Sequence, residues 1–286
     1  MIQRTEYKNY NKAYKLMIER YNSANEVVDD LKRRPEKAGG WTSRKSKVES
    51  DPDWHGVKTY DEALELLRTG YQPTVDKLKS KLKSNIAGNG KRISFKNNIA
   101  GFSPIVPLAM MSVPNCMVDM QMKPIKNKVI DVYYDMGVLA SVTSNQIIEN
   151  GQKLLGAILE LEAQEYRFNL YAVQGYSDYE SADILVIKLK SANQPLDLKR
   201  ISFPLTHTAF FRVIGFDWYH KCPESTYRCG YGNCLSNNID DMQDFAKKVF
   251  GKNAVMFSCN QLIREDENHL KEVIENAGNN RESKAS

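Results

Sequence analysis

The sequence of 286 residues contains no long apolar run and no apolar segment near its start. No stretch approaches the roughly 18 consecutive apolar residues of a membrane-spanning helix, so no membrane partner is expected. The opening residues, MIQRTEYKNYNKAYK, lack the apolar core of a secretory signal. We therefore expect a cytoplasmic protein whose five cysteines stay reduced, as free thiols or as metal ligands.

The motifs of common catalytic centres are also missing. There is no Gly-x-Ser-x-Gly elbow, no His-Glu-x-x-His pair and no dinucleotide-binding fingerprint. A phosphate-binding loop ending at Gly90 and Lys91 would need Gly where Asn85 stands and Ser or Thr where Arg92 stands. The sequence thus argues against an NTPase, predicts no cofactor, and favours a binding protein over an enzyme.

Positive charge is concentrated in the N-terminal third of the chain. Residues 1–100 carry 21 Lys or Arg and 13 Asp or Glu, a net charge of +8, whereas the remainder carries a net charge of −3. The charge lies in residues 31–47 and 77–92, which interleave Gly, Ser or Asn as mobile, solvated segments do. This pattern is typical of a solubilising surface or linker, but also of a face that contacts phosphates and releases their counterions. The candidate nucleic-acid-binding residues are Lys32, Arg33, Arg34, Arg44, Lys45, Lys77, Lys79, Lys81, Lys83, Lys91 and Arg92.

The N-terminal segment, residues 1–125, is expected to be helical and basic. Apolar residues at mixed three- and four-residue intervals predict a helix over residues 6–32, followed by a mobile connector. A second, short amphipathic helix is predicted to end at Gly70, and we interpret Trp54 and Tyr60 beside it as packing residues. Asn89-Gly90 predicts a two-residue hairpin turn.

From Val129 onward the pattern alternates between strands and helices. Strands are predicted over residues 129–135, 166–173, 183–190 and 253–259, with a polar loop between the second and third. Thr143 and Gln146 form a capping box before a helix whose apolar face runs from residue 147 to 161. This order predicts a three-layer α/β core over residues 126–278 and a disordered tail over residues 279–286.

The order of strand, acidic turn, helix, strand, hairpin and strand resembles a von Willebrand factor A-like core. Such domains place an Asp-x-Ser-x-Ser motif at the end of the first strand to hold Mg²⁺. The corresponding stretch here is Asp135-Met136-Gly137-Val138-Leu139, which lacks both serines. A single carboxylate is a poor Mg²⁺ site, so the resemblance implies a metal-free scaffold with Asp135 as a weak metal candidate.

A larger part of the chain resembles an uncharacterised family of phage and prophage proteins. The resemblance rests on DWHGVKTYDEALELLRTGY, ISFKNNIAGFSPIVPLAMMSVPNCM, PLDLKRISFPLTHTAFFRVIGF and CGYG. It implies a phage setting in a bacterial host cell and no particular chemistry. It also implies that the N-terminal segment and the core form one unit.

A second weak metal candidate is the segment HKCPESTYRCGYGNC, which holds His220, Cys222, Cys229 and Cys234. Its ligand gaps of one, six and four residues differ from the short Cys-x₂₋₄-Cys loop of structural zinc sites. We therefore interpret it as a glycine-rich surface loop. His207 is interpreted as a buried or helix-end histidine, and Arg212 as part of a helix-surface ion pair.

Three function classes follow from these observations. The first is a non-enzymatic phage accessory protein that binds nucleic acid through its basic N-terminal region. The second is a protein–protein adaptor with a metal-free von Willebrand factor A-like core, for example a partner of an AAA+ ATPase. The third is an enzyme, which only His207, Asp135 and the cysteine segment favour.

Overall fold

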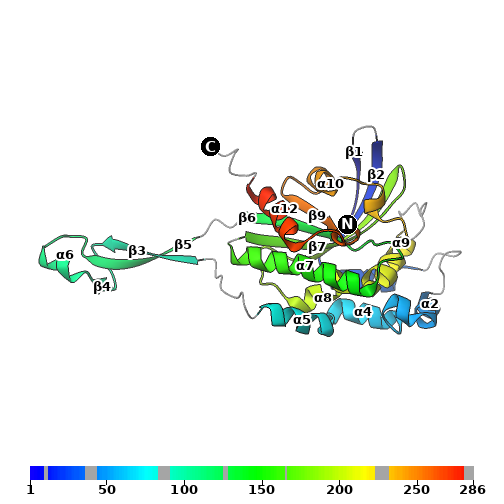
Figure 1. Cartoon of the computed structure of the whole chain (residues 1–286), viewed down its shortest axis with the longest axis horizontal. Helices are drawn as coiled ribbons and strands as arrows, with labels where there is room; N and C mark the ends of the chain where they lie inside the picture. The colour runs from blue at the N-terminus through cyan, green and yellow to red at the C-terminus, as the bar shows by residue number, and fades with distance from the viewer. Residues whose placement is uncertain are drawn as a thin grey trace.

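The computed structural model describes residues 1–9, 12–35, 44–82, 91–124, 128–164, 166–222 and 232–279 (Figure 1). Two sheets are present, a six-stranded sheet at the centre of a compact body and a three-stranded sheet that extends away from it. Asn89-Gly90, and residues 280–286 of the expected disordered tail, lie outside the described residues.

The six-stranded sheet has the order β1-β2-β8-β7-β6-β9 and mixes parallel and antiparallel pairs. Strands β7, β6 and β9 run parallel, β8 is antiparallel to β7, and β2 is parallel to β8 but antiparallel to β1. The strands are β1 (Ile2–Asn9), β2 (Lys12–Tyr21), β6 (Lys128–Asp135), β7 (Tyr166–Ser177), β8 (Ser181–Lys190) and β9 (Ala254–Ser258).

Helices cover both faces of this sheet, which confirms the predicted α/β class. The larger core lies under α1 (Ala24–Arg33), α4 (Tyr60–Thr69), α7 (Ser144–Ala163), α8 (Leu198–Thr206), α9 (Phe216–Lys221), α11 (Cys259–Leu262) and α12 (Glu267–Asn279). The smaller core, on the other face, lies under α10 (Met242–Val249) and the turn Leu235–Asn237. Helices α2 (Arg44–Ser50), α3 (Pro52–His55) and α5 (Gln72–Leu82) flank α4, and a π-helix (Phe210–Gly215) precedes α9.

The predicted helix over residues 6–32 is wrong for most of its length. Residues 2–21 form the β1–β2 hairpin, and only α1 is helical, starting after Ser23, whose hydroxyl accepts the N–H of Glu26. Two patterns coincide in β2. Apolar residues recur at three- and four-residue intervals, as in a helix, while Tyr14, Leu16 and Ile18 alternate onto one buried face of the sheet. A short apolar segment of this kind fits either period, and pairing with β8 selects the strand.

The elements predicted after residue 128 are confirmed. Thr143 and Gln146 make the capping box of α7, and the four predicted strands appear as β6, β7, β8 and β9. The loop expected between β7 and β8 is shorter than predicted, because β7 continues to Ser177 and Asp178 closes the turn by accepting two N–H groups. Since β2 joins β8, the six-stranded sheet also crosses the expected boundary at residue 125.

Residues 91–124, which we call the arm, form the second sheet. Its order is β3-β5-β4, with β3 (Lys91–Asn98), β4 (Ser103–Pro104) and β5 (Met117–Pro124), and α6 (Val106–Met110) lies at its far end (Figure 1). Lys91 pairs with Pro124, so the arm leaves and rejoins the body at one place, which we call its root.

Candidate functional site

Asp135 ends β6 between the carboxyl ends of two parallel neighbours, β7 and β9. In α/β sheets this edge is where ligand sites form, because the turns after the strands gather there. The Asp135 side chain is fully buried, and Oδ1 accepts the N–H groups of Gly137 at 3.1 Å and Gly175 at 3.2 Å. The acidic turn is thus closed by one backbone amide of the turn and one of β7.

The other carboxylate oxygen, Oδ2, has no hydrogen-bond partner among the described residues. Burial raises the pKa of Asp135 to about 7, while the two N–H groups act in the opposite direction. A Cβ atom on Gly137 would lie 3.3 Å from both carboxylate oxygens and 3.3 Å from Cβ of Cys234. Asp135 is therefore covered by Gly137 and Cys234 and does not face solvent.

This arrangement does not fit a Mg²⁺ site of the kind that the von Willebrand factor A resemblance implies. Gly137 and Leu139 stand where the motif has serine, and Thr143 uses its hydroxyl to cap α7. Hard cations need several oxygen ligands, and here one buried carboxylate stands with amide donors. In the part of the chain that the structure describes, no group of three or more His, Cys, Asp or Glu could hold a metal ion.

The cysteine segment is divided between two places in the fold. Cys222 ends α9, is buried, and its Sγ lies 3.8 Å from Oε2 of Glu19 on β2. Cys234 pairs with Tyr176 at the end of β7, on the other side of β8. His220 is buried on α9, and Cys229 lies outside the described residues.

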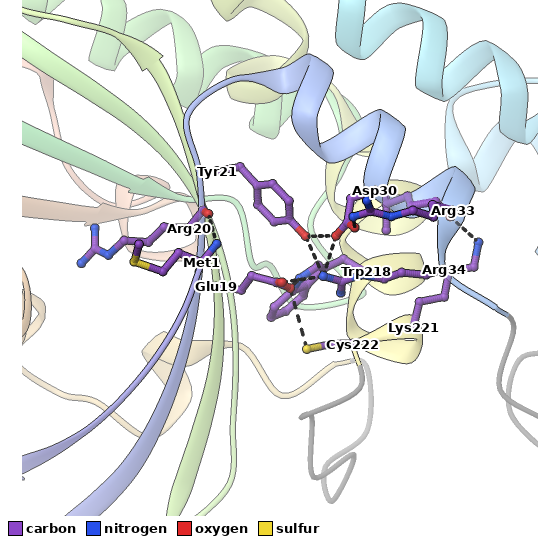
Figure 2. Close-up of polar contacts among 11 residues, drawn as sticks. Met1, Glu19, Arg20, Tyr21, Asp30, Arg33, Arg34, Trp218, Lys221 and Cys222 are labelled. Carbon is purple, nitrogen blue, oxygen red and sulfur yellow. Dashed lines mark hydrogen bonds and ion pairs between the residues drawn. The ribbon is translucent and has the colours of Figure 1, made fainter.

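A buried polar network around Glu19 joins β2, α1 and α9 (Figure 2). Glu19 accepts hydrogen bonds from Arg34 at 2.5 Å and from Nε1 of Trp218 at 2.7 Å. Arg34 also pairs with Asp30 and donates to the hydroxyl of Tyr21. One signal of this network is present in the sequence, an acid that follows the apolar residues LMI in the stretch KLMIERY of β2.

The network fixes the charge state of its members. Burial alone would raise the pKa of Asp30, but hydrogen bonds from Tyr21 and Arg33 together with the charge of Arg34 lower it below its usual value. Burial, and the hydrogen bond to Asp30, raise the pKa of Tyr21 well above its usual value. Arg34 is thus committed to two internal carboxylates and is not presented to a nucleic acid.

The other candidate basic residues are spread over several elements. Lys32 and Arg33 are exposed at the end of α1, where Arg33 pairs with Asp30, and Lys77 is exposed on α5. Arg44 and Lys45 lie on α2, Lys79 and Lys81 on α5, and Lys91 and Arg92 on β3, while Lys83 lies outside the described residues. Figure 1 shows α2 and α5 at opposite ends of the helices that flank the body, so these two helices are not adjacent.

His207 and Arg212 are both buried, and only the histidine lies as predicted. His207 ends α8 and its Nδ1 accepts the N–H of Ala209, while burial lowers its pKa to about 4. The predicted surface ion pair of Arg212 is wrong, because its guanidinium donates to the carbonyl oxygens of Trp54 and Val142 and lies 4.6 Å from the Trp54 ring centre. Arg212 therefore ties α3 to the turn before α7.

A hollow of about 860 Å³ lies beside the carboxyl end of β9. It is lined by the start of α7, the start of α10, the end of β9 and the first half of α12, and includes Gln146, Gln243, Asn260, Arg264, Glu265 and His269. Among the described residues that line the hollow, Phe257 is the one Phe, Tyr or Trp. Small-molecule sites are instead lined mainly by apolar and aromatic groups. Asp135 does not line this hollow, although both lie at the same edge of the sheet.

Fold and site together define a mixed α/β protein with a closed acidic turn and an open, polar hollow at the carboxyl edge of its parallel strands. Among protein families, residues 4–278 match the one described as "Domain of unknown function (DUF7192)", and the chain belongs to this family. No curated protein and no solved structure matches the chain. In the described residues no helix is both long enough and apolar enough to cross a membrane.

Proposed function

We propose that the chain is a non-enzymatic adaptor whose α/β body binds a protein partner at the hollow beside β9. The observation that carries this proposal is the separation of the hollow from Asp135, which is buried and bonded to backbone amides. An open surface with mixed charges and amide side chains is typical of a protein interface, where polar groups form the rim.

Further support comes from the edge strand itself. Gln243 on α10 donates from Nε2 to the carbonyl of Met256 at 2.7 Å and accepts the N–H of Met256 at 3.3 Å. A side chain therefore occupies backbone groups of β9 that would otherwise be open to pairing with another strand. The partner is thus expected to bind through side chains in the hollow rather than by adding a strand at Met256.

We also propose a von Willebrand factor A-like core and a role in a phage-infected bacterial cell. The resemblance to a von Willebrand factor A-like core rests on the order of β6, the acidic turn, α7, β7 and β8. That resemblance supports a metal-free scaffold that recruits a partner such as an AAA+ ATPase. The phage resemblance supports a phage accessory role in a bacterial host cell.

The test is affinity purification from host and phage-infected lysates with the wild-type chain and with Gln261→Arg, which places a large cation in the hollow. We expect a retained protein that the variant loses, with unchanged circular dichroism and thermal unfolding. Tyr179→Ala, an exposed position away from the hollow, is the matched control. Equal retention by wild type and Gln261→Arg would show that the hollow does not bind the partner.

Nucleic-acid binding is the second candidate, and the net charge of +8 over residues 1–100 favours it. In the described chain α5 is followed by β3, so Lys77, Lys79, Lys81, Lys91 and Arg92 belong to two elements that are consecutive in the sequence. Nothing in these elements resembles a recognition helix, so little sequence preference is expected.

Binding of single-stranded and duplex DNA at a series of salt concentrations tests this candidate. Affinity should fall by about 0.9 decade per decade of salt for each phosphate neutralised on duplex, and about 0.7 on single strands. Replacing Lys77, Lys79, Lys81 and Lys83 with Ala should flatten this slope. Replacing the exposed Lys247 and Lys252 with Ala, on and beyond α10, is the control. A wild-type chain that binds neither DNA at low salt rules the candidate out.

A further inference from the structure

The arm exposes a concentration of large apolar side chains that the adaptor proposal does not use. No described side chain between residues 95 and 120 is buried. Of the ten large apolar residues exposed in the described chain, seven lie in the arm: Phe95, Ile99, Phe102, Val106, Met110, Met111 and Met120. Met110 is 82% exposed and Met111 73% exposed, at the end of α6.

A small antiparallel sheet with no buried face is marginally stable in water. Isolated exposed apolar residues are common, but a contiguous group on a projecting element marks an interaction site. The seven side chains, each about half exposed or more, offer an area comparable to the ~800 Å² that one partner contributes to a standard interface. Among the described residues nothing covers these side chains, so their apolar surroundings come from elsewhere.

Charge along the arm is sharply divided. Residues 97–118, which we call the tip, contain no Asp, Glu, Lys, Arg or His. Lys96 and Asp119 are the first charged residues on either side, and they face each other across β3 and β5. Toward the root come Lys91, Arg92 and Lys123, so the arm as a whole carries a net charge of +3 with all of it behind the tip.

Many backbone N–H groups of the tip form hydrogen bonds within the tip itself. Phe102 donates its N–H to Val118, and Ile105 to Cys116, across the sheet. In and after α6, the N–H groups of Ala109, Met111 and Val113 donate to Ile105, Pro107 and Leu108. Pro104, Pro107 and Pro114 have no N–H to satisfy. The tip can thus leave water without stranding these amide groups, which is the main cost of placing backbone in lipid.

We propose that the arm inserts its tip into an anionic lipid membrane surface, with the root cations at the level of the headgroups. Interfacial segments bury apolar side chains about 5–10 Å below the headgroups. Lys96 lies two residues before the end of β3, about 7 Å along a strand that rises 3.3 Å per residue. Its amine therefore stays among anionic headgroups while Ile99, Phe102 and α6 reach the acyl chains.

Other occupants fit the charge pattern less well. Two copies of the arm aligned side by side would bring their basic roots together, and aligned head to tail would set each tip against cations. Nucleic acid matches the root but takes only one or two apolar wedges, not a continuous uncharged tip of 22 residues. An anionic bilayer offers negative charge and hydrocarbon at the two depths that the arm requires.

The test is co-sedimentation of the full chain with vesicles of phosphatidylcholine alone or with about 30% phosphatidylglycerol, an anionic surface that attracts basic segments. We expect binding to the anionic vesicles, at least about tenfold stronger than to the neutral ones. The double variant Met110→Asp/Met111→Asp should lose at least about tenfold of this binding, because two charges would enter the acyl region. Tyr179→Asp, which is 80% exposed and lies outside the arm, should bind as the wild type does.

A second measurement separates insertion from adsorption by charge. Quenching of Phe102→Trp fluorescence by lipids brominated on the acyl chain should occur with anionic vesicles and be absent in buffer.

Binding that Met110→Asp/Met111→Asp retains would show that only the basic root contacts the lipid, and would overturn the proposal. Failure of the wild type to bind anionic vesicles at low salt would also overturn it. In that case, self-association or DNA binding that the double variant loses would assign the tip to a second copy or to nucleic acid. The adaptor proposal is tested separately, since Gln261 lies in the hollow and not in the arm.

Discussion

Glu19 on β2 accepts a hydrogen bond from Nε1 of Trp218 on α9 at 2.7 Å, across 199 positions of sequence. Both side chains are buried. The same carboxylate also pairs with Arg34, the residue that follows α1. Glu19 therefore connects three elements of the larger core. It does so from a strand where the sequence pattern predicts a helix.

Replacing Glu19 with Gln should destabilise the chain, by up to about 3 kcal/mol, because Arg34 would keep Asp30 as its only carboxylate in a largely buried site. Urea unfolding followed by circular dichroism measures the change. The double variant Glu19→Gln/Arg34→Met should recover part of the loss, since it removes the unpaired charge. Strictly additive effects of the two replacements would contradict a direct interaction.

Asp135→Asn should change how stability depends on pH. The pKa of Asp135 is raised to about 7 in the folded chain from 3.8, so the folded state holds this proton more tightly than the unfolded state does. Its contribution is therefore complete below about pH 4 and is lost as pH rises from 4 to 7, at about 1.4 kcal/mol per pKa unit.

Relative to wild type, Asp135→Asn should accordingly be more favourable at pH 8 than at pH 5, by a difference on the order of a few kcal/mol. Urea unfolding at the two pH values measures it. Replacement of the exposed Asp240 by Asn is the control. The same free-energy change at both pH values for Asp135→Asn would mean that the carboxyl is ionised throughout this range.

Leu155→Asp should abolish soluble expression. Leu155 is fully buried in the larger core on α7, and the variant would bury an unpaired carboxylate. Asn145→Asp adds the same charge to the same helix at an exposed position in its first turn, and should express normally. A soluble Leu155→Asp chain with cooperative unfolding would show that α7 does not pack on the sheet.

Replacing residues 91–124 with a linker of about four Gly and Ser residues should leave the body folded. The two ends of the arm are paired, Lys91 with Pro124, so a short linker spans them, and the arm contributes no described residue to either core. The midpoint of thermal unfolding should shift by no more than about 4 °C, the effect of roughly 1 kcal/mol in a chain of this size. Loss of cooperative unfolding would indicate that the arm packs on the body.

Sequence reasoning succeeded where local signals and the pattern of buried residues agreed. The capping box at Thr143 and the apolar face of α7 indicate the same helix, and β8 and β9 carry the continuous apolar runs ILVI and AVMF, typical of strands buried on both faces. It failed in β2, where the local pattern fits two periods and the choice depends on β8, a partner more than 160 positions away.

The site was harder to predict because charge in a sequence carries no information on burial. Arg34 was assigned to a phosphate-contacting face and Arg212 to a surface ion pair, yet both are held by internal acceptors, Glu19 and Asp30 for one and two carbonyl groups for the other. Conversely, Met110 and Met111 are apolar residues whose exposure, at the end of α6 on the projecting arm, is visible only in the fold.

Pairing of β2 with β8 also imposes an order on synthesis. Lys15 pairs with Ser181, so the partner of β2 leaves the ribosome 166 residues after β2 itself. At about 5–20 residues per second this is a delay of roughly 10–30 s, during which the β2 edge of the β1–β2 hairpin stays open and its apolar face stays uncovered. A two-stranded hairpin is barely stable alone. The first 21 residues of the chain therefore do not form a stable sheet until most of the body has been made.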